Sequence, residues 1–155
     1  MALEDVRAFL AQHAPDIAII DQGASTATVA EAAETLGVEP GRIAKTLSVR
    51  LGEQVVLIVT RGDARLDNRK TKDQFGVRPR MLGHEETEGL TGHQVGGVCP
   101  FGLRTDLPIY CDVSLNAFDT VFPAAGSRTA SVELTPERLV RITNAQWVDV
   151  CQPPA

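Results

Sequence analysis

The feature that most constrains the fold is a long apolar hairpin in the first half of the chain. Residues 44–51 and 54–60 are rich in β-branched and aliphatic side chains, and only Gly52 and Glu53 separate the two runs. Two such runs joined by a short turn containing glycine predict a pair of antiparallel strands. Helical patterns lie irregularly before and after this hairpin, which predicts the α+β class with a mixed, mostly antiparallel sheet. A doubly wound α/β fold would need strict strand–helix alternation and a glycine-rich first turn, and neither is present.

Capping residues and apolar spacing place the helices. Leu3, Val6, Phe9 and Leu10 share one helical face and predict an amphipathic helix at the start of the chain. Cap residues, Gly and Pro punctuation and apolar runs predict further helices at residues 29–36, 67–75 and 84–90 and from Thr135 onward, and strands at residues 17–20, 80–82, 107–113, 120–122, 129–134 and 147–150.

Composition indicates a soluble globular protein. The 155 residues are 43% hydrophobic and 23% charged, which predicts one domain spanning residues 1–155. Glu4 and Asp5 stand where a signal peptide would carry basic residues, and no apolar run is long enough to cross a membrane. The three cysteines match no zinc-binding spacing. We therefore expect a cytosolic protein that uses no membrane, metal or cofactor.

The charge distribution points to one anionic partner. The chain has a net charge of −5, yet residues 61–80 hold seven basic and three acidic side chains. A local basic surface on an acidic protein fits a phosphate backbone gripped at one place. The alternative is a solvated helix whose charges only maintain solubility.

Three places are candidates for chemistry, although the sequence has no nucleophile elbow, phosphate loop or paired metal-ligand motif. Lys45 starts an apolar strand, where the alternative is a snorkelling or edge-strand lysine. Residues 96–102 form a loop whose glycines and proline can present N–H groups to a carbonyl, or simply make a tight turn. Residues 124–131 form a small-residue turn, which could equally be a hairpin tip. His13, His84 and His93 are expected to be exposed polar residues.

Three segments carry a resemblance to a known family: Ile43-Ala44-Lys45-Thr46-Leu47, Gly96-Gly97-Val98-Cys99-Pro100-Phe101-Gly102, and Gly126-Ser127-Arg128 followed by Val132 to Leu139. In this order the chain resembles the YbaK family, the free-standing relatives of the editing domain inserted in bacterial prolyl-tRNA synthetase. The resemblance spans residues 3–150. It implies a compact α+β fold that hydrolyses, in trans, the ester joining a wrong amino acid to tRNA.

The resemblance also implies roles for particular residues. Lys45 matches the family's functional lysine, and residues 96–100 match its Gly-x-x-x-Pro loop. The predicted catalytic set is therefore Lys45, Gly96, Gly97 and Pro100. The predicted substrate-binding set is Thr26, Thr28, Thr46, Val98, Cys99, Phe101, Gly126, Ser127, Arg128 and Ser131. The predicted tRNA-binding set is Arg61, Arg65, Arg69, Lys70 and Lys72.

The chemistry fits these roles because an aminoacyl ester is already activated. Backbone N–H groups around residues 97–101 would polarise the carbonyl, and a positioned water or ribose hydroxyl would attack it. Lys45 would anchor the terminal ribose–phosphate or the ester region.

Two departures from the family pattern bear on the amino-acid specificity. Cys99 stands where close relatives often have Ser, and Ala125 to Ser131 depart from the family's Gly-Gly-x-Arg-Gly pattern. The substrates considered are Ala, Ser, Thr and Cys on tRNA, with a slight lean toward a hydroxylated residue.

Two other interpretations and two partner questions stay open. The chain could bind aminoacyl-tRNA or a nucleotide-like ligand without turning it over. It could also be a thiol enzyme whose Cys99 is activated by backbone amides. The expected partner is the acceptor end of aminoacyl-tRNA. The sequence leaves open whether a synthetase or an elongation factor assists, and whether the protein is a monomer or a homodimer.

Overall fold

A computed structural model describes residues 2–153. Its helices are α1 (Ala2–His13), α2 (Val29–Leu36), α3 (Asn68–Phe75), α4 (His84–Thr91) and α5 (Pro136–Thr143), with 3₁₀ turns at Pro40–Arg42 and Val113–Ala117. Its strands are β1 (Ile20–Asp21), β2 (Ile43–Leu51), β3 (Gln54–Arg61), β4 (Arg80–Met81), β5 (Ile109–Asp112), β6 (Phe122–Pro123), β7 (Ala130–Ser131) and β8 (Gln146–Val148). No described helix is long and apolar enough to cross a membrane.

The predicted hairpin forms the centre of the main sheet. β2 and β3 pair antiparallel from Ala44 opposite Arg61 to Leu51 opposite Gln54. The strand order is β4-β2-β3-β5-β8, with β4 antiparallel to β2, and with β5 and β8 added in parallel beyond β3. β6 also pairs with β2 in parallel, and β1 and β7 form a separate two-stranded sheet. The predicted α+β fold with a mixed sheet is confirmed.

Local capping explains why the helix boundaries follow the sequence closely. The Thr28 hydroxyl accepts a hydrogen bond from the N–H of Glu31 at the start of α2, and Gly37 ends that helix with φ of 70°. The Asp67 carboxylate caps α3 in the same way, and Thr135 caps α5. Each cap satisfies N–H groups that the first turn of a helix leaves without partners.

Several predicted strands are shorter in the structure. Of residues 17–20 only Ile20 belongs to a strand, and of residues 129–134 only Ala130 and Ser131 do. The second of these segments is bound by scattered hydrogen bonds, such as Val132 N–H to the Pro123 carbonyl, rather than by a continuous ladder. Residues 107–113 form a strand only over Ile109–Asp112 because Asp112 caps a 3₁₀ turn that begins at Val113.

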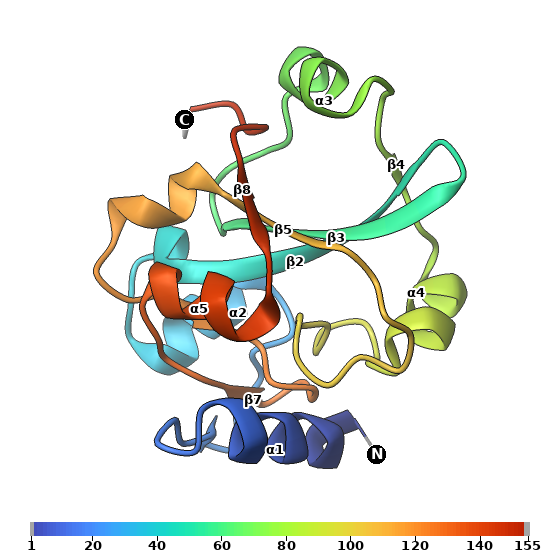
Figure 1. The fold of residues 1–155 in the computed structure, drawn as a ribbon. Helices are drawn as coiled ribbons and strands as arrows, with labels where there is room; N and C mark the ends of the chain where they lie inside the picture. The colour runs from blue at the N-terminus through green and yellow to red at the C-terminus, as the bar shows by residue number, and fades with distance from the viewer. Residues whose placement is uncertain (1, 154–155) are drawn as a thin grey trace.

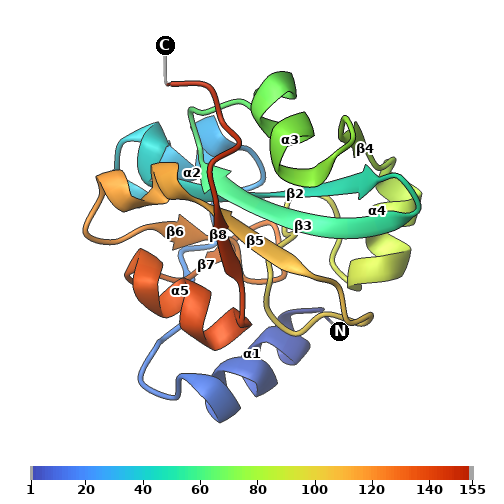
Figure 2. The same ribbon diagram turned by 45° about the horizontal axis from the view of Figure 1, so that its top comes forward.

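The two faces of the main sheet pack against different helices. α1 and α3 lie at opposite ends of the molecule, and the β2–β3 hairpin runs between them (Figures 1 and 2). On the α1 side, Val59 of β3 packs in a large core with Val6, Leu10 and Leu139. On the α3 side, the opposite hairpin face, including Ile58, forms a smaller core. Packing of α2 against β2 makes a third cluster. The hairpin therefore presents alternate side chains to two separate environments.

Candidate active site

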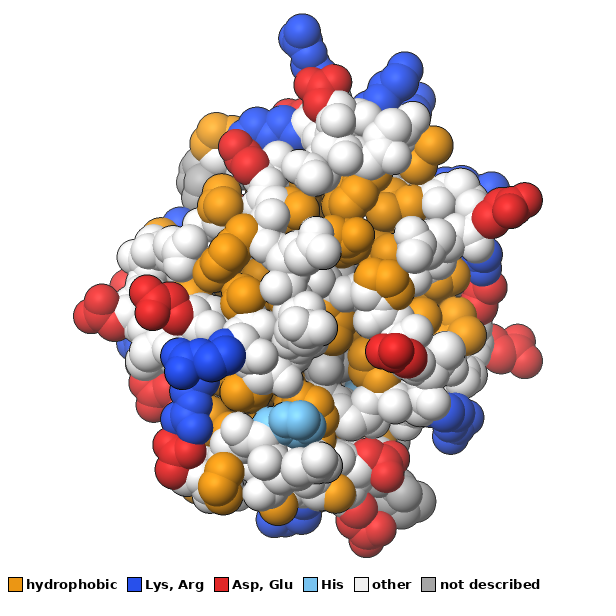
Figure 3. Space-filling view, in the orientation of Figure 1, with side chains coloured by type: hydrophobic (Ala, Val, Ile, Leu, Met, Phe, Trp, Pro, Cys, Tyr) orange, Lys and Arg blue, Asp and Glu red, His pale blue; other side chains and the backbone are white. Residues whose placement is uncertain are grey.

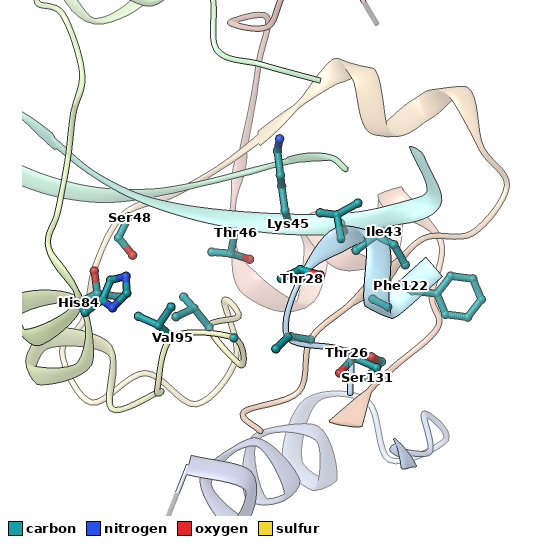
Figure 4. Close-up of a pocket in the computed structure, with 18 of the residues that line it drawn as sticks. Thr26, Thr28, Ile43, Lys45, Thr46, Ser48, His84, Val95, Phe122 and Ser131 are labelled. Atoms are coloured by element: carbon teal, nitrogen blue, oxygen red, sulfur yellow. The ribbon is translucent and has the colours of Figure 1, made fainter. Parts of the chain in front are cut away.

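A cavity of about 280 Å³ lies beside β2. The start of α2, the β4–α4 connection and the loop at residues 95–98 enclose it. It is lined by Thr26, Ala27, Thr28, Val29, Ala32, Ile43, Ala44, Lys45, Thr46, Ser48, Met81, Leu82, His84, Thr87, Val95, Gly96, Val98, Phe122, Ala124 and Ser131. Figure 4 shows Ser48, His84 and Val95 at one end of this cavity and Thr26, Ser131 and Phe122 at the other. Thr26, Thr28, Thr46, Gly96, Val98 and Ser131, all predicted site residues, therefore meet at one place.

The loop at residues 95–98 packs tightly against the turn at residues 126–128. A Cβ atom built on Gly97 would lie 2.8–2.9 Å from backbone atoms of Ser127, which is closer than real Cβ contacts come. The Gly97 carbonyl accepts a 3.1 Å hydrogen bond from the N–H of Gly126. Gly97 is therefore required by close approach of two backbones, not by an unusual φ.

Arg128 joins its own turn to the loop at residues 95–98 and to the segment before α2. Its Nε donates to the Val95 carbonyl at 3.0 Å. Its own carbonyl accepts from the N–H of Thr26 at 2.7 Å and from the Thr26 hydroxyl at 3.2 Å. Gly126, Ser127 and Arg128 do not line the cavity; they hold the residues that do.

The N–H groups of the loop differ in availability. The N–H of Gly97 donates to the Gln94 carbonyl at 2.9 Å, so it is already used. Within the part of the chain that the structure describes, the N–H groups of Gly96 and Val98 donate to no other backbone group. Both residues line the cavity. That donors around residues 97–101 face the substrate stays a prediction, and among the residues that line the cavity Gly96 and Val98 are the ones of this loop with N–H groups free of a backbone acceptor in the described residues.

Two hydroxyl groups on β2 have no hydrogen-bond partner. Thr46 Oγ1 and Ser48 Oγ are both inaccessible to solvent, and neither contacts a donor or acceptor within the described residues. Because the two residues are two positions apart on a strand, their side chains project from the same face. Figure 4 shows both beneath β2, on the side of the cavity.

Lys45 lies between these positions and projects the other way. Figure 4 shows its ammonium on the opposite side of β2 from the Thr46 and Ser48 hydroxyls. Its Nζ donates to the Ala64 carbonyl at 2.5 Å. Desolvation by burial is the main cause that lowers the pKa of Lys45. In this structure the ammonium is therefore outside the cavity, and the catalytic role of Lys45 stays a prediction.

Cys99, Pro100 and Phe101 lie behind the loop. Cys99 and Phe101 are fully buried in the core on the α1 side, and Pro100 borders a second cavity of about 470 Å³ with Phe9. Burial raises the pKa of Cys99 to about 12. These three residues therefore support the loop instead of facing the first cavity, which also weighs against Cys99 as a nucleophile.

The expectation that His93 is exposed is wrong. Its side chain is fully buried, and Nε2 lies 2.8 Å from the Phe101 carbonyl and 3.6 Å from Cys99 Sγ. Burial lowers the pKa of His93, so the ring is held neutral. It links the two ends of the 93–101 segment.

Four of the five predicted tRNA-binding residues lie on α3 or in the segment that leads to it (Arg65, Arg69, Lys70 and Lys72), whereas Arg61 is the last residue of β3. Arg61 is bound to Asp63 and stacks over Phe118, and Lys70 donates to Asp149 and to the Cys151 carbonyl at 3.0 Å each. Arg65, Arg69 and Lys72 are exposed. Figure 3 shows basic side chains mixed with acidic ones at this end of the molecule. The basic residues near α3 thus lie across the main sheet from the cavity, whereas Arg61 pairs with the cavity-lining Ala44.

Sequence reasoning missed several lining residues, including Ser48, His84, Thr87 and Phe122. Ser48 could have been found, because it is a polar residue two positions from Thr46 in an otherwise apolar strand. His84 and Thr87 could not, since their approach to β2 depends on the pairing of β4 with β2.

Comparison with known proteins identifies the family. The model of the aminoacyl-tRNA editing domain matches residues 24–142. The chain belongs to this family. It is 49% identical over 154 residues to the uncharacterized protein YwhH of Bacillus subtilis, covering 98% of each chain. It is also 34% identical over 121 residues to an Enterococcus faecalis protein named "Putative Cys-tRNA(Pro)/Cys-tRNA(Cys) deacylase EbsC", covering 76% of this chain and 73% of that one.

Solved structures and longer enzymes of the family agree with this assignment. A crystal structure described as "a putative trans-editing enzyme for prolyl tRNA synthetase" superposes with a TM-score of 0.89 at 33% identity, covering 98% of both chains. The proline–tRNA ligase of Shouchella clausii is 33% identical over 95 residues, which are 61% of this chain and 17% of the ligase. The editing domain here thus resembles both free-standing proteins and a segment of a synthetase.

Proposed function

We propose that this protein hydrolyses the ester bond of tRNA mischarged with a small amino acid, acting in trans. The observation that carries the proposal is the cavity beside β2, which is lined by Gly96 and Val98, whose N–H groups have no backbone acceptor among the described residues, and by residues with buried hydroxyls. The cavity volume of about 280 Å³ leaves room for a small aminoacyl group. The names of EbsC and of the solved trans-editing relative support the same reaction class.

The proposed mechanism needs no strong nucleophile because the ester is already activated. The substrate carbonyl oxygen accepts hydrogen bonds from the Gly96 and Val98 N–H groups, which stabilise the negative charge that develops there. A water oxygen attacks the carbonyl carbon, the bond to the ribose oxygen breaks, and that oxygen takes up the proton that the water loses. Where a neighbouring ribose hydroxyl attacks first, the acyl group moves to that hydroxyl oxygen, and water then hydrolyses the new ester in the same way. Orientation by the cavity accounts for much of the acceleration.

The basic residues near α3 are assigned to the tRNA acceptor stem. Arg65, Arg69 and Lys72 are exposed there, and the Lys45 ammonium lies on the same side of the sheet. We assign Lys45 to phosphate binding, as a point-charge anchor. One tRNA reaches both surfaces if its single-stranded 3′ end passes round the β4 edge, where Met81 and Leu82 border the cavity.

A binding module that holds aminoacyl-tRNA without turnover is the second candidate, since the same cavity and basic surface would serve it. Deacylation assays on tRNA charged with Ala, Ser, Thr, Cys or Pro separate the two. We expect turnover of one or two small residues and none of Pro. Saturable binding of the same tRNAs with no turnover would replace the hydrolase with the binding module.

A further inference from the structure

The starting observation is that the two buried hydroxyls on β2, those of Thr46 and Ser48, lower the stability of the fold. A buried polar group without a partner is destabilising, and most buried hydroxyls in proteins are hydrogen-bonded. Ser48 is only 5% exposed, and its Oγ has no partner among the described residues; Thr46 Oγ1 is in the same condition. Two such atoms side by side on the wall of one cavity are therefore better explained by a ligand than by folding.

We infer that Ser48, assisted by Thr46, recognises a hydroxyl group on the side chain of the misacylated amino acid. This inference rests on the proposed function and makes it narrower. The substrate class is then tRNA charged with serine or threonine, in preference to alanine or cysteine.

The depth of the two hydroxyls assigns them to the amino-acid side chain. His84 and Thr28 line the same cavity but are exposed and form its rim, Gly96, Val98 and Thr46 are half-buried, and Ser48 is buried. A tRNA is too large to enter, so its ribose and ester stay at that rim beside the loop N–H groups. The side chain extends beyond the ester and reaches the buried part of the wall, to which Ser48 belongs.

The lining favours a hydroxyl over the other polar group of the substrate, the α-ammonium group, which can only donate. No described residue that lines this cavity is Asp or Glu, so nothing anionic there pairs with the α-ammonium group. A hydroxyl is both donor and acceptor, and two neighbouring hydroxyls can satisfy both functions. A thiol is a weak donor and acceptor, and a methyl group is neither. Alanine or cysteine would leave Ser48 and Thr46 unpaired, and unpaired groups of this kind are what give an enzyme strong discrimination.

The test compares substrates that differ by one atom. One tRNA is charged with Ala, Ser or Cys, and in a second series with 2-aminobutyrate or Thr, and kcat/KM is measured for each. The variants are Ser48→Ala and Thr46→Val, with Thr105→Ala as a control in an exposed loop. We expect wild type to prefer Ser over Ala, and Ser48→Ala to lower the Ser:Ala ratio about 10- to 100-fold. Thr105→Ala should leave the ratio as in wild type.

Thermal melting provides a second readout that a purely structural role would not produce. Because Ser48 Oγ is unpaired, Ser48→Ala should melt at or above the wild-type temperature. Thr91→Val should melt lower, since the buried Thr91 hydroxyl donates to the Thr87 carbonyl and accepts from the N–H of His93.

Each outcome bears on one claim. An equal loss on every substrate in Ser48→Ala would mean that the hydroxyls hold a group common to all aminoacyl esters, which overturns the inference but not the hydrolase. A wild-type preference for Ala or Cys over Ser would overturn it too. Failure of folded wild type to hydrolyse any substrate would instead refute the proposed function, and the inference with it.

Discussion

Replacing Gly97 with alanine should destabilise the protein and reduce the proposed deacylation, because it displaces the backbone of the loop at residues 95–98. The added Cβ would lie 2.8–2.9 Å from Ser127 backbone atoms, so the two segments must separate by about half an ångström to reach ordinary contact. Overpacking of this kind costs about 1–3 kcal/mol, and weakening the hydrogen bond from Gly126 adds about 1 kcal/mol. We expect a total loss of about 2–4 kcal/mol, or roughly 5–15 °C in melting temperature for a domain of this size.

The matched control is Gly89→Ala in α4, where a Cβ meets no atom within 4 Å. An exposed helical glycine replaced by alanine should gain about 0.5–1 kcal/mol, so the two variants shift the melting temperature in opposite directions. The displaced loop also carries Gly96 and Val98, so deacylation by Gly97→Ala should fall at least about tenfold below that of Gly89→Ala. A Gly97→Ala protein that melts within about 2 °C of wild type and keeps full activity would refute the described packing.

Three further predictions follow from individual side chains. Burial lowers the pKa of His93, so below about pH 6.5 the unfolded chain binds a proton that the folded chain does not, and the free energy of unfolding should decrease as the pH is lowered. Denaturant unfolding at pH values from 8 to 5 measures this decrease. A His93→Gln protein whose free energy of unfolding depends on pH as steeply as that of wild type would contradict the prediction. Cys99, with its pKa raised to about 12, should resist alkylation in the folded protein at pH 8, and Cys99→Ala should keep deacylase activity; a folded but inactive Cys99→Ala would restore the thiol mechanism. Lys45→Ala should mainly raise KM for tRNA, and the triple change of Arg65, Arg69 and Lys72 to Gln should raise KM and also make it less dependent on salt concentration. A decrease confined to kcat in Lys45→Ala would instead indicate that the ammonium acts on the ester.

Elements defined by local chemistry were predictable from the sequence. The start of α2 at Val29 and its end at Gly37 depend on a hydroxyl cap and a left-handed glycine, both within a few residues of the boundary. The hairpin is similar, since Gly52 (φ 65°) and the apolar runs beside it fix its register. By contrast, the apolar residues of segments 17–20 and 129–134 are there to pack in the protein interior. How much of each segment forms a strand depends on pairing partners that are distant in the sequence.

The same distinction applies to the candidate site. Thr26, Gly96 and Ser131 could be grouped from motif order, and the structure brings them to one cavity. The direction of Lys45 could not be read from the sequence, because a strand residue faces one side or the other according to register. Nor could the burial of His93 and Cys99, whose surroundings come from α1 and α5 as well as from their own loop.

The measurement that tests the central claim most directly is the initial rate of deacylation of Ser-tRNA, Thr-tRNA, Ala-tRNA, Cys-tRNA and Pro-tRNA by the purified chain, with Gly97→Ala beside it. The account predicts fastest hydrolysis of the hydroxylated residues, no hydrolysis of Pro, and a large loss in the variant. Equal rates for wild type and Gly97→Ala, or no turnover of any charged tRNA by folded wild type, would contradict it.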